Sequence, residues 1–92
     1  MEQFKGWRQF LELVLSLKKK DELEQIFDLF LTIEEKQLLA QRYLIIKELL
    51  DEKISQREIA KEHQVSIAQI TRGSNALKRI NPKVKHFLKT KL

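Results

Sequence analysis

The chain has no cysteine among its 92 residues, only two glycines and a single proline. Without cysteine it has neither disulfides nor thiolate metal sites, and we expect a cytoplasmic protein. The isolated glycines, Gly6 and Gly73, exclude a phosphate-cradling glycine loop. No nucleophile and base stand at a recognisable spacing, so we do not expect an enzyme.

Long apolar runs are missing as well. The run at residues 10–17 is interrupted by Glu12 and has no cleavage site, and no segment approaches the roughly 20 residues that span a membrane. We therefore expect no signal peptide and no membrane partner. The two histidines, His63 and His86, are far apart with no clustered ligands, so we predict no metal site and no cofactor.

Charge is unevenly distributed along the chain. Residues 1–52 hold 8 basic and 11 acidic side chains, a net of −3, whereas residues 53–92 hold 10 and 2, a net of +8. A basic half of this kind is expected for contacts with nucleic-acid phosphates, although a solubilising lysine face has the same composition. Lysines near the carboxyl end, such as Lys85 and Lys89, fit the second interpretation.

Apolar residues recur at helical spacing throughout and predict an all-α, single-domain fold of six helices. Residues 1–52 form a helical scaffold, 55–77 a helix-turn-helix unit and 82–92 a final helix that opens at Pro82. The scaffold helices are expected at about residues 2–18, at about 21–31, and from a Thr32 cap to about Asp51.

Two capping boxes define the helix-turn-helix unit. Ser55 precedes Glu58 by three residues, and Ser66 precedes Gln69 by the same spacing, so two helices start eleven residues apart. The apolar positions expected to pack them together are Ile59, Ala60, Val65 and Ile70. Capping and apolar spacing alone are equally typical of a generic helical hairpin.

The outer face of the second helix favours DNA. At 100° per residue, Ala68, Thr71, Arg72 and Asn75 share one side, which is small and polar where a solvated helix carries long charged side chains. Such a face lets the backbone approach base edges in a groove. Gly73 in mid-helix costs about 1 kcal/mol relative to alanine, so it indicates a packing or functional requirement.

Two further features have a structural and a functional interpretation. Arg42 lies within an apolar arc of the third helix, where it either extends to water or a carboxylate, or stacks on a planar or anionic ligand. Trp7 and five phenylalanines, clustered mainly near the amino end, either form an ordinary core or a core shared between two subunits.

Segments 55–58 and 70–75, supported by Trp7, Leu29, Leu31, Thr32 and Arg42, resemble those of the Trp repressor family. The resemblance covers nearly the whole chain. It implies an intertwined bacterial homodimer that binds double-stranded operator DNA with L-tryptophan as corepressor.

The corepressor site implied by this resemblance comprises Leu29, Leu31, Thr32, Arg42, Arg72 and Gly73. Arg42 and Arg72 would sandwich the indole, and Arg72 would also meet the carboxylate with help from Thr32. Backbone carbonyls of Leu29 and Leu31, from the partner subunit, would accept from the ammonium group. Gly73 would leave room for the ring.

The DNA contacts implied in the same way are Gln56, Arg57, Ile67, Ala68, Gln69, Thr71 and Lys78. Arg57 is the candidate for a bidentate guanine contact, and Lys78 for a phosphate contact. Four positions depart from the family's usual residues: Ala60, Gln69, Ala76, and Gln64 in the turn. Such turns commonly have glycine at that point, so the backbone is expected to be either somewhat strained or differently shaped.

The expected mechanism is a population shift. Tryptophan favours the arrangement in which the two helix-turn-helix units of the dimer can bind DNA, and so represses genes for tryptophan synthesis or uptake. Two alternatives stay open at this point. One is a DNA-binding regulator of the same fold that answers to another ligand or to none, and the other is an adaptor that uses its basic face on an acidic protein.

Overall fold

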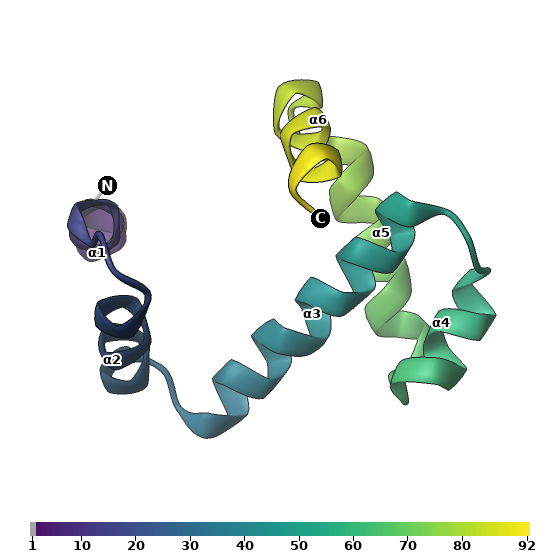
Figure 1. Cartoon of the computed structure of the whole chain (residues 1–92), viewed down its shortest axis with the longest axis horizontal. Coiled ribbons are helices and arrows are strands. Elements are labelled where there is room, and N and C mark those ends of the chain that lie inside the picture. The colour runs from purple at the N-terminus through teal and green to yellow at the C-terminus, as the bar shows by residue number, and fades with distance from the viewer. Residues whose placement is uncertain (1) are drawn as a thin grey trace. The chain divides into compact units, whose positions relative to one another are not determined.

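The computed structural model describes residues 2–92, leaving out the side chain of Glu2, and all regular structure in this part of the chain is helical (Figure 1). A short 3-10 turn, η1 (Glu2–Phe4), is followed by α1 (Lys5–Ser16), α2 (Lys20–Phe30), α3 (Ile33–Asp51), α4 (Gln56–His63), α5 (Ile67–Arg79) and α6 (Pro82–Lys91). Within these residues there are six α-helices and no strand, which confirms the predicted all-α fold.

The helix ends follow from local chemistry. The first helix is shorter than predicted, because residues 2–4 form the 3-10 turn and Leu17 turns extended at φ −76° and ψ 140°. At the start of α2, the Glu22 carboxylate accepts from the backbone N–H groups of Lys18 and Lys19, both at 3.3 Å. At α6, the Asn81 carboxamide oxygen accepts from the backbone N–H of Lys83 at 2.8 Å.

The chain divides into two compact units, residues 1–34 and 35–92. The predicted single domain, with a scaffold that ends at residue 52, stays a prediction. In the first unit Phe10 holds the helices together through ring contacts with Trp7, Phe27 and Phe30, whose centroids lie 6.0, 5.9 and 5.2 Å from its own. Neither α1 nor α2 has a buried residue, and Trp7 is 57% exposed.

The core of the second unit joins α3 to the helix-turn-helix unit. Its buried side chains are Ile45 of α3, Ile59 of α4, Val65 of the turn and Ile70 of α5, and partly buried Leu49, Ile54 and Ala60 pack against them. Ile59 and Ile70 are fully buried. The predicted packing of Ile59, Ala60, Val65 and Ile70 is therefore confirmed, and Ile45 attaches that pair of helices to α3.

Gly73 is a buried residue of α5 that faces α3. A methyl group added at this position would lie 3.1 Å from Ile45 Cγ2 and 3.5 Å from Leu49 Cδ1. The glycine thus allows a helix contact that a larger side chain would push apart. This close approach supplies the packing requirement that a mid-helix glycine indicated.

The turn between α4 and α5 passes through a left-handed residue. Gln64 has φ 54° and ψ 45°, and the next residue, Val65, donates its backbone N–H to the carbonyl of Ala60 at 3.1 Å. A non-glycine residue in this conformation costs about 1–2 kcal/mol. The strain expected at Gln64 is therefore present in the turn.

We expect Ile70→Ala to lower the free energy of unfolding by about 2–5 kcal/mol, because Ile70 is one of the four buried side chains of the core in residues 2–92 and its truncation opens a cavity there. The matched control is Ile67→Ala on the same helix, where the side chain is 50% exposed and the loss should stay below about 1 kcal/mol. Chemical denaturation of both variants measures the difference. Equal losses would contradict the assignment of the core.

Candidate functional site

Reciprocal hydrogen bonds fix the starts of the two short helices. The Ser55 hydroxyl accepts from the backbone N–H of Glu58 at 3.1 Å, and the Glu58 carboxylate accepts from the backbone N–H of Ser55 at 3.1 Å. Ser66 and Gln69 repeat the pattern at 3.2 and 3.3 Å. Both predicted capping boxes are present, so α4 and α5 begin where the sequence predicted.

The side of α5 opposite its packed face is exposed. Ile70 and Gly73 point inward, whereas the outward positions are Ile67, Ala68, Thr71, Arg72 and Asn75. Gln56, Arg57 and Lys78 are exposed too. The structure thus presents the predicted DNA-contacting face to solvent, with Gln69 as a partial exception.

Gln69 is half-buried, and its side-chain oxygen already accepts the backbone N–H of Ser66. A base contact by this residue therefore uses the amide nitrogen or breaks the cap. Sequence reasoning gave Gln69 both roles, and the geometry shows that the two compete.

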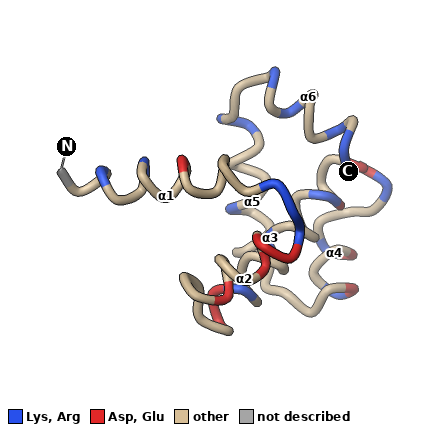
Figure 2. The backbone as a smooth tube through the Cα atoms, turned by 60° about the vertical axis from the view of Figure 1, so that its left-hand side comes forward, with Lys and Arg blue, Asp and Glu red and all other residues tan. Residues whose placement is uncertain are grey.

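A cleft of about 400 Å³ lies beside the start of α4. Ser55 and Gln56 line it at the helix start. Three lysines, Lys78 of α5 with Lys85 and Lys89 of α6, also line it together with one acidic residue, Glu52, so that basic side chains outnumber acidic ones three to one. No acidic residue occurs in α6, whose trace in Figure 2 shows only basic charges. An open cleft with this charge and a helix start suits a phosphate group.

Sequence reasoning missed Lys85 and Lys89, which it treated as solubilising. Their four-residue spacing places them on one face of α6, but only the fold shows that this face lines the cleft with Lys78. Lys83 and Lys91 belong to the same helix without lining the cleft.

The six residues of the predicted ligand site fall in both units. Arg42 of α3 and Arg72 of α5 are exposed and share the second unit with buried Gly73, whereas Leu29, Leu31 and Thr32 belong to the first. Among the described residues, no carboxylate forms an ion pair with Arg42. Its guanidinium is therefore accessible to a ligand, and the assembled pocket stays a prediction.

Within residues 2–92, no helix is long and apolar enough to cross a membrane.

Comparisons with known proteins agree on one family. The family model for the Trp repressor protein matches residues 5–92. A Trp operon repressor homolog of Chlamydia caviae is 55% identical over 84 residues, which covers 91% of this chain and 83% of the relative. A homolog of the same name from Chlamydia trachomatis serovar D is 48% identical, and the match covers 95% of this chain and 93% of the relative. Another, from Vibrio campbellii, is 39% identical, and the match covers 98% of this chain and 90% of the relative.

The lysines of the cleft can be tested with DNA. We expect the double variant Lys85→Ala/Lys89→Ala to reduce the slope of log affinity against log salt by about 2 for each bound protomer, because each phosphate that a lysine neutralises adds roughly 0.9 to that slope. The control, Lys83→Ala/Lys91→Ala, removes the same charge from α6 outside the cleft and should change the slope less. Equal effects on binding to one fixed duplex would show that only net charge matters.

Proposed function

The chain belongs to the Trp repressor family, and we propose that it is a tryptophan-dependent repressor that binds operator DNA as a homodimer. The observation that supports this most directly is the position of Arg72. It is exposed on α5, next to the glycine through which α5 packs on α3, the helix that bears Arg42. A ligand held by both arginines would link α5, the helix proposed to contact DNA bases, to α3.

The residues proposed for the pocket match the chemistry of a free aromatic amino acid. The carboxylate of tryptophan pairs with the guanidinium of Arg72, and Thr32 assists it. The indole is a flat apolar group that stacks between the guanidinium planes of Arg42 and Arg72. Backbone carbonyls of Leu29 and Leu31, supplied by the partner subunit, accept from the ammonium group.

Tryptophan acts in this proposal by shifting a population. Among the described residues, α3 contributes one buried side chain, Ile45, and partly buried Leu49 to the core that it shares with the helix-turn-helix unit, so other arrangements of that unit on α3 would lie at a modest free-energy cost. A ligand bound between α3 and α5 shifts the equilibrium between these arrangements by the difference in its affinity for them, and tryptophan favours the arrangement that fits DNA. Abundant tryptophan then silences genes for its own synthesis or uptake, in the cytoplasm where the operator is accessible.

On DNA, the outer face of α5 enters the major groove with the first turn of α4 beside it. Arg57 contacts guanine, while Ile67, Ala68, Gln69 and Thr71 face base edges directly or through water. Lys78 and the start of α4 at Gln56 hold the phosphate backbone. The family is one of transcriptional repressors, not of enzymes, and the proposal requires no catalytic step.

Calorimetric titration tests the pocket. We expect Arg72→Ala to weaken tryptophan binding about 10–100-fold, because it removes a charge-assisted contact with the carboxylate. Arg79→Ala is the control, since it removes an exposed arginine from the last turn of the same helix. Undiminished binding by Arg72→Ala would remove this residue from the pocket.

Operator binding with and without tryptophan tests the function as a whole. With a duplex selected from a random-sequence pool at fixed salt, we expect tryptophan to raise the affinity by about 5–150-fold, the usual range of allosteric coupling. An affinity for the duplex that does not change with tryptophan would support a DNA-binding regulator that responds to another ligand or to none. Binding without any preference for a selected sequence would support the adaptor.

A further inference from the structure

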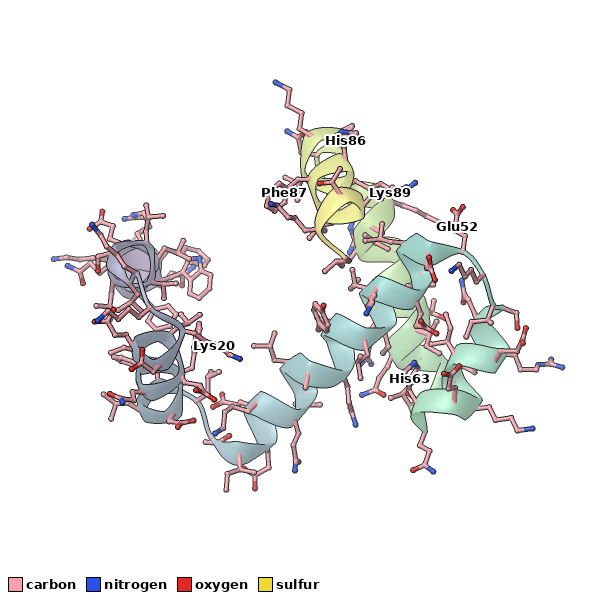
Figure 3. The ribbon with its side chains drawn as sticks, in the orientation of Figure 1. Lys20, Glu52, His63, His86, Phe87 and Lys89 are labelled. Carbon is pink, nitrogen blue, oxygen red and sulfur yellow. The ribbon has the colours of Figure 1, made fainter. Side chains whose placement is uncertain are left out.

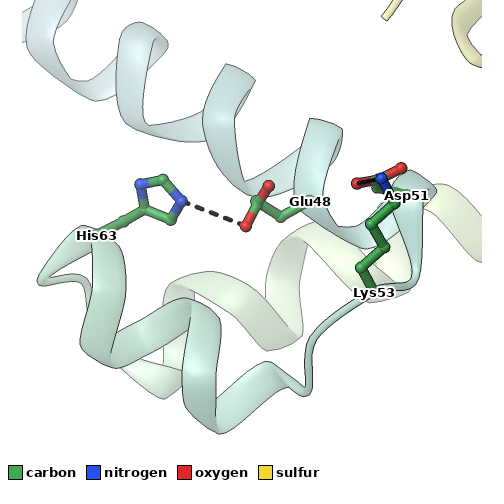
Figure 4. Close-up of polar contacts among 4 residues, drawn as sticks. All are labelled: Glu48, Asp51, Lys53 and His63. Carbon is green, nitrogen blue, oxygen red and sulfur yellow. Dashed lines mark ion pairs between the residues drawn. The ribbon is translucent and has the colours of Figure 1, made fainter.

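His63, the last residue of α4, faces a carboxylate on α3. Its Nε2 atom lies 3.6 Å from Oε2 of Glu48, and the two side chains are only 20% and 23% exposed (Figure 4). The adjacent Glu62 brings a second carboxylate, so that one potential ligand atom from each of the three residues lies within 4.8 Å of the others. Sequence spacing had indicated no clustered ligands for His63, whereas the fold brings Glu48 of α3 near it.

The ion pair alone does not satisfy the imidazole. His63 Nε2 is buried and has no hydrogen-bond partner among the described residues. Its 3.6 Å separation from Glu48 exceeds the length of an N–H···O hydrogen bond. Buried polar atoms are nearly always paired, so this nitrogen indicates a partner that the polypeptide does not supply.

We propose that His63, Glu48 and Glu62 bind a divalent transition-metal ion of the Zn²⁺ type. Zn²⁺ bonds to imidazole nitrogen at about 2.0–2.1 Å and to carboxylate oxygen at about 2.0–2.2 Å, which places two tetrahedral ligands about 3.3–3.5 Å apart. The Glu48 and His63 atoms already lie near this separation. Three protein ligands leave a fourth position for water.

The type of ligand selects the ion. An imidazole together with carboxylates suits zinc and its neighbours among the transition metals, whereas Mg²⁺ and Ca²⁺ prefer ligand sets made of oxygen alone. The nearby ion pair between Lys53 and Asp51, at 3.8 Å, is a separate surface contact whose side chains are 79% and 48% exposed. It takes no part in the site.

Bound metal would clamp α4 to α3. Glu48 lies one turn after Ile45 on α3, and Glu62 and His63 form the end of α4 just before the left-handed Gln64. The ion would thus join the two elements that Ile45 and Ile59 already hold together through the core. This site goes beyond the proposed use of tryptophan and needs neither tryptophan nor DNA.

The test is a Zn²⁺ titration of the untagged, chelator-treated full chain, followed by calorimetry and by thermal unfolding. We expect one ion per chain and a higher unfolding temperature when Zn²⁺ is present. His63→Gln should weaken binding at least tenfold. The matched control is His86→Gln, because Figure 3 places this other histidine on α6, away from the cluster at the end of α4.

Glu62→Gln keeps the test decisive if His63→Gln fails to fold, because Glu62 is exposed and its removal leaves the core intact. It too should weaken Zn²⁺ binding, with unchanged helical circular dichroism in the absence of metal. The proposal is overturned if the wild-type chain binds no Zn²⁺. It is equally overturned if His63→Gln and Glu62→Gln bind Zn²⁺ as the wild type does, or if His86→Gln alone abolishes binding.

Discussion

The close contact between α5 and α3 at Gly73 is the constraint on which the rest of the second unit depends. Because Gly73 has no side chain, Ile45 reaches the backbone of α5, and Ile70 of the same helix face is buried beside it. Once these positions point inward, helix geometry turns Ala68, Thr71 and Arg72 outward. This packing contact therefore leaves the opposite side of α5, which carries Arg72, exposed to solvent.

Sequence reasoning succeeded where the determinants are local. The capping boxes at Ser55 and Ser66 act over three residues, and the structure contains both. The strain at Gln64 is also local, because it comes from one non-glycine residue that adopts a left-handed backbone conformation. The six helices follow from apolar periodicity, whereas the start of α1 at Lys5 does not, because a 3-10 turn has almost the same pattern over three residues.

The features that sequence reasoning missed depend on contacts between distant segments. Glu48 and His63 are fifteen positions apart on different helices, and neither has a distinctive sequence context. Nothing in the sequence distinguishes Lys85 and Lys89 from other surface lysines. The fold does, because both line the cleft beside the start of α4. The ligand residues were named through family resemblance, and three of the six lie in the first unit, whereas Arg42, Arg72 and Gly73 lie in the second.

Under both proposals, two ligands would act on the helix-turn-helix unit, one through α5 and the other through α4. In the two proposals, tryptophan between Arg42 and Arg72 would link α3 to α5, and a metal ion between Glu48 and His63 would link α3 to α4. Both α4 and α5 contribute to the shared core of Ile59, Val65 and Ile70, so fixing either helix would restrict the other. If both ligands prefer one posture of this pair of helices, each must raise the affinity for the other by the same factor, because the coupling free energy belongs to the posture and not to either site. A helix-turn-helix unit held by so small a core is therefore suited to control by whatever binds along α3.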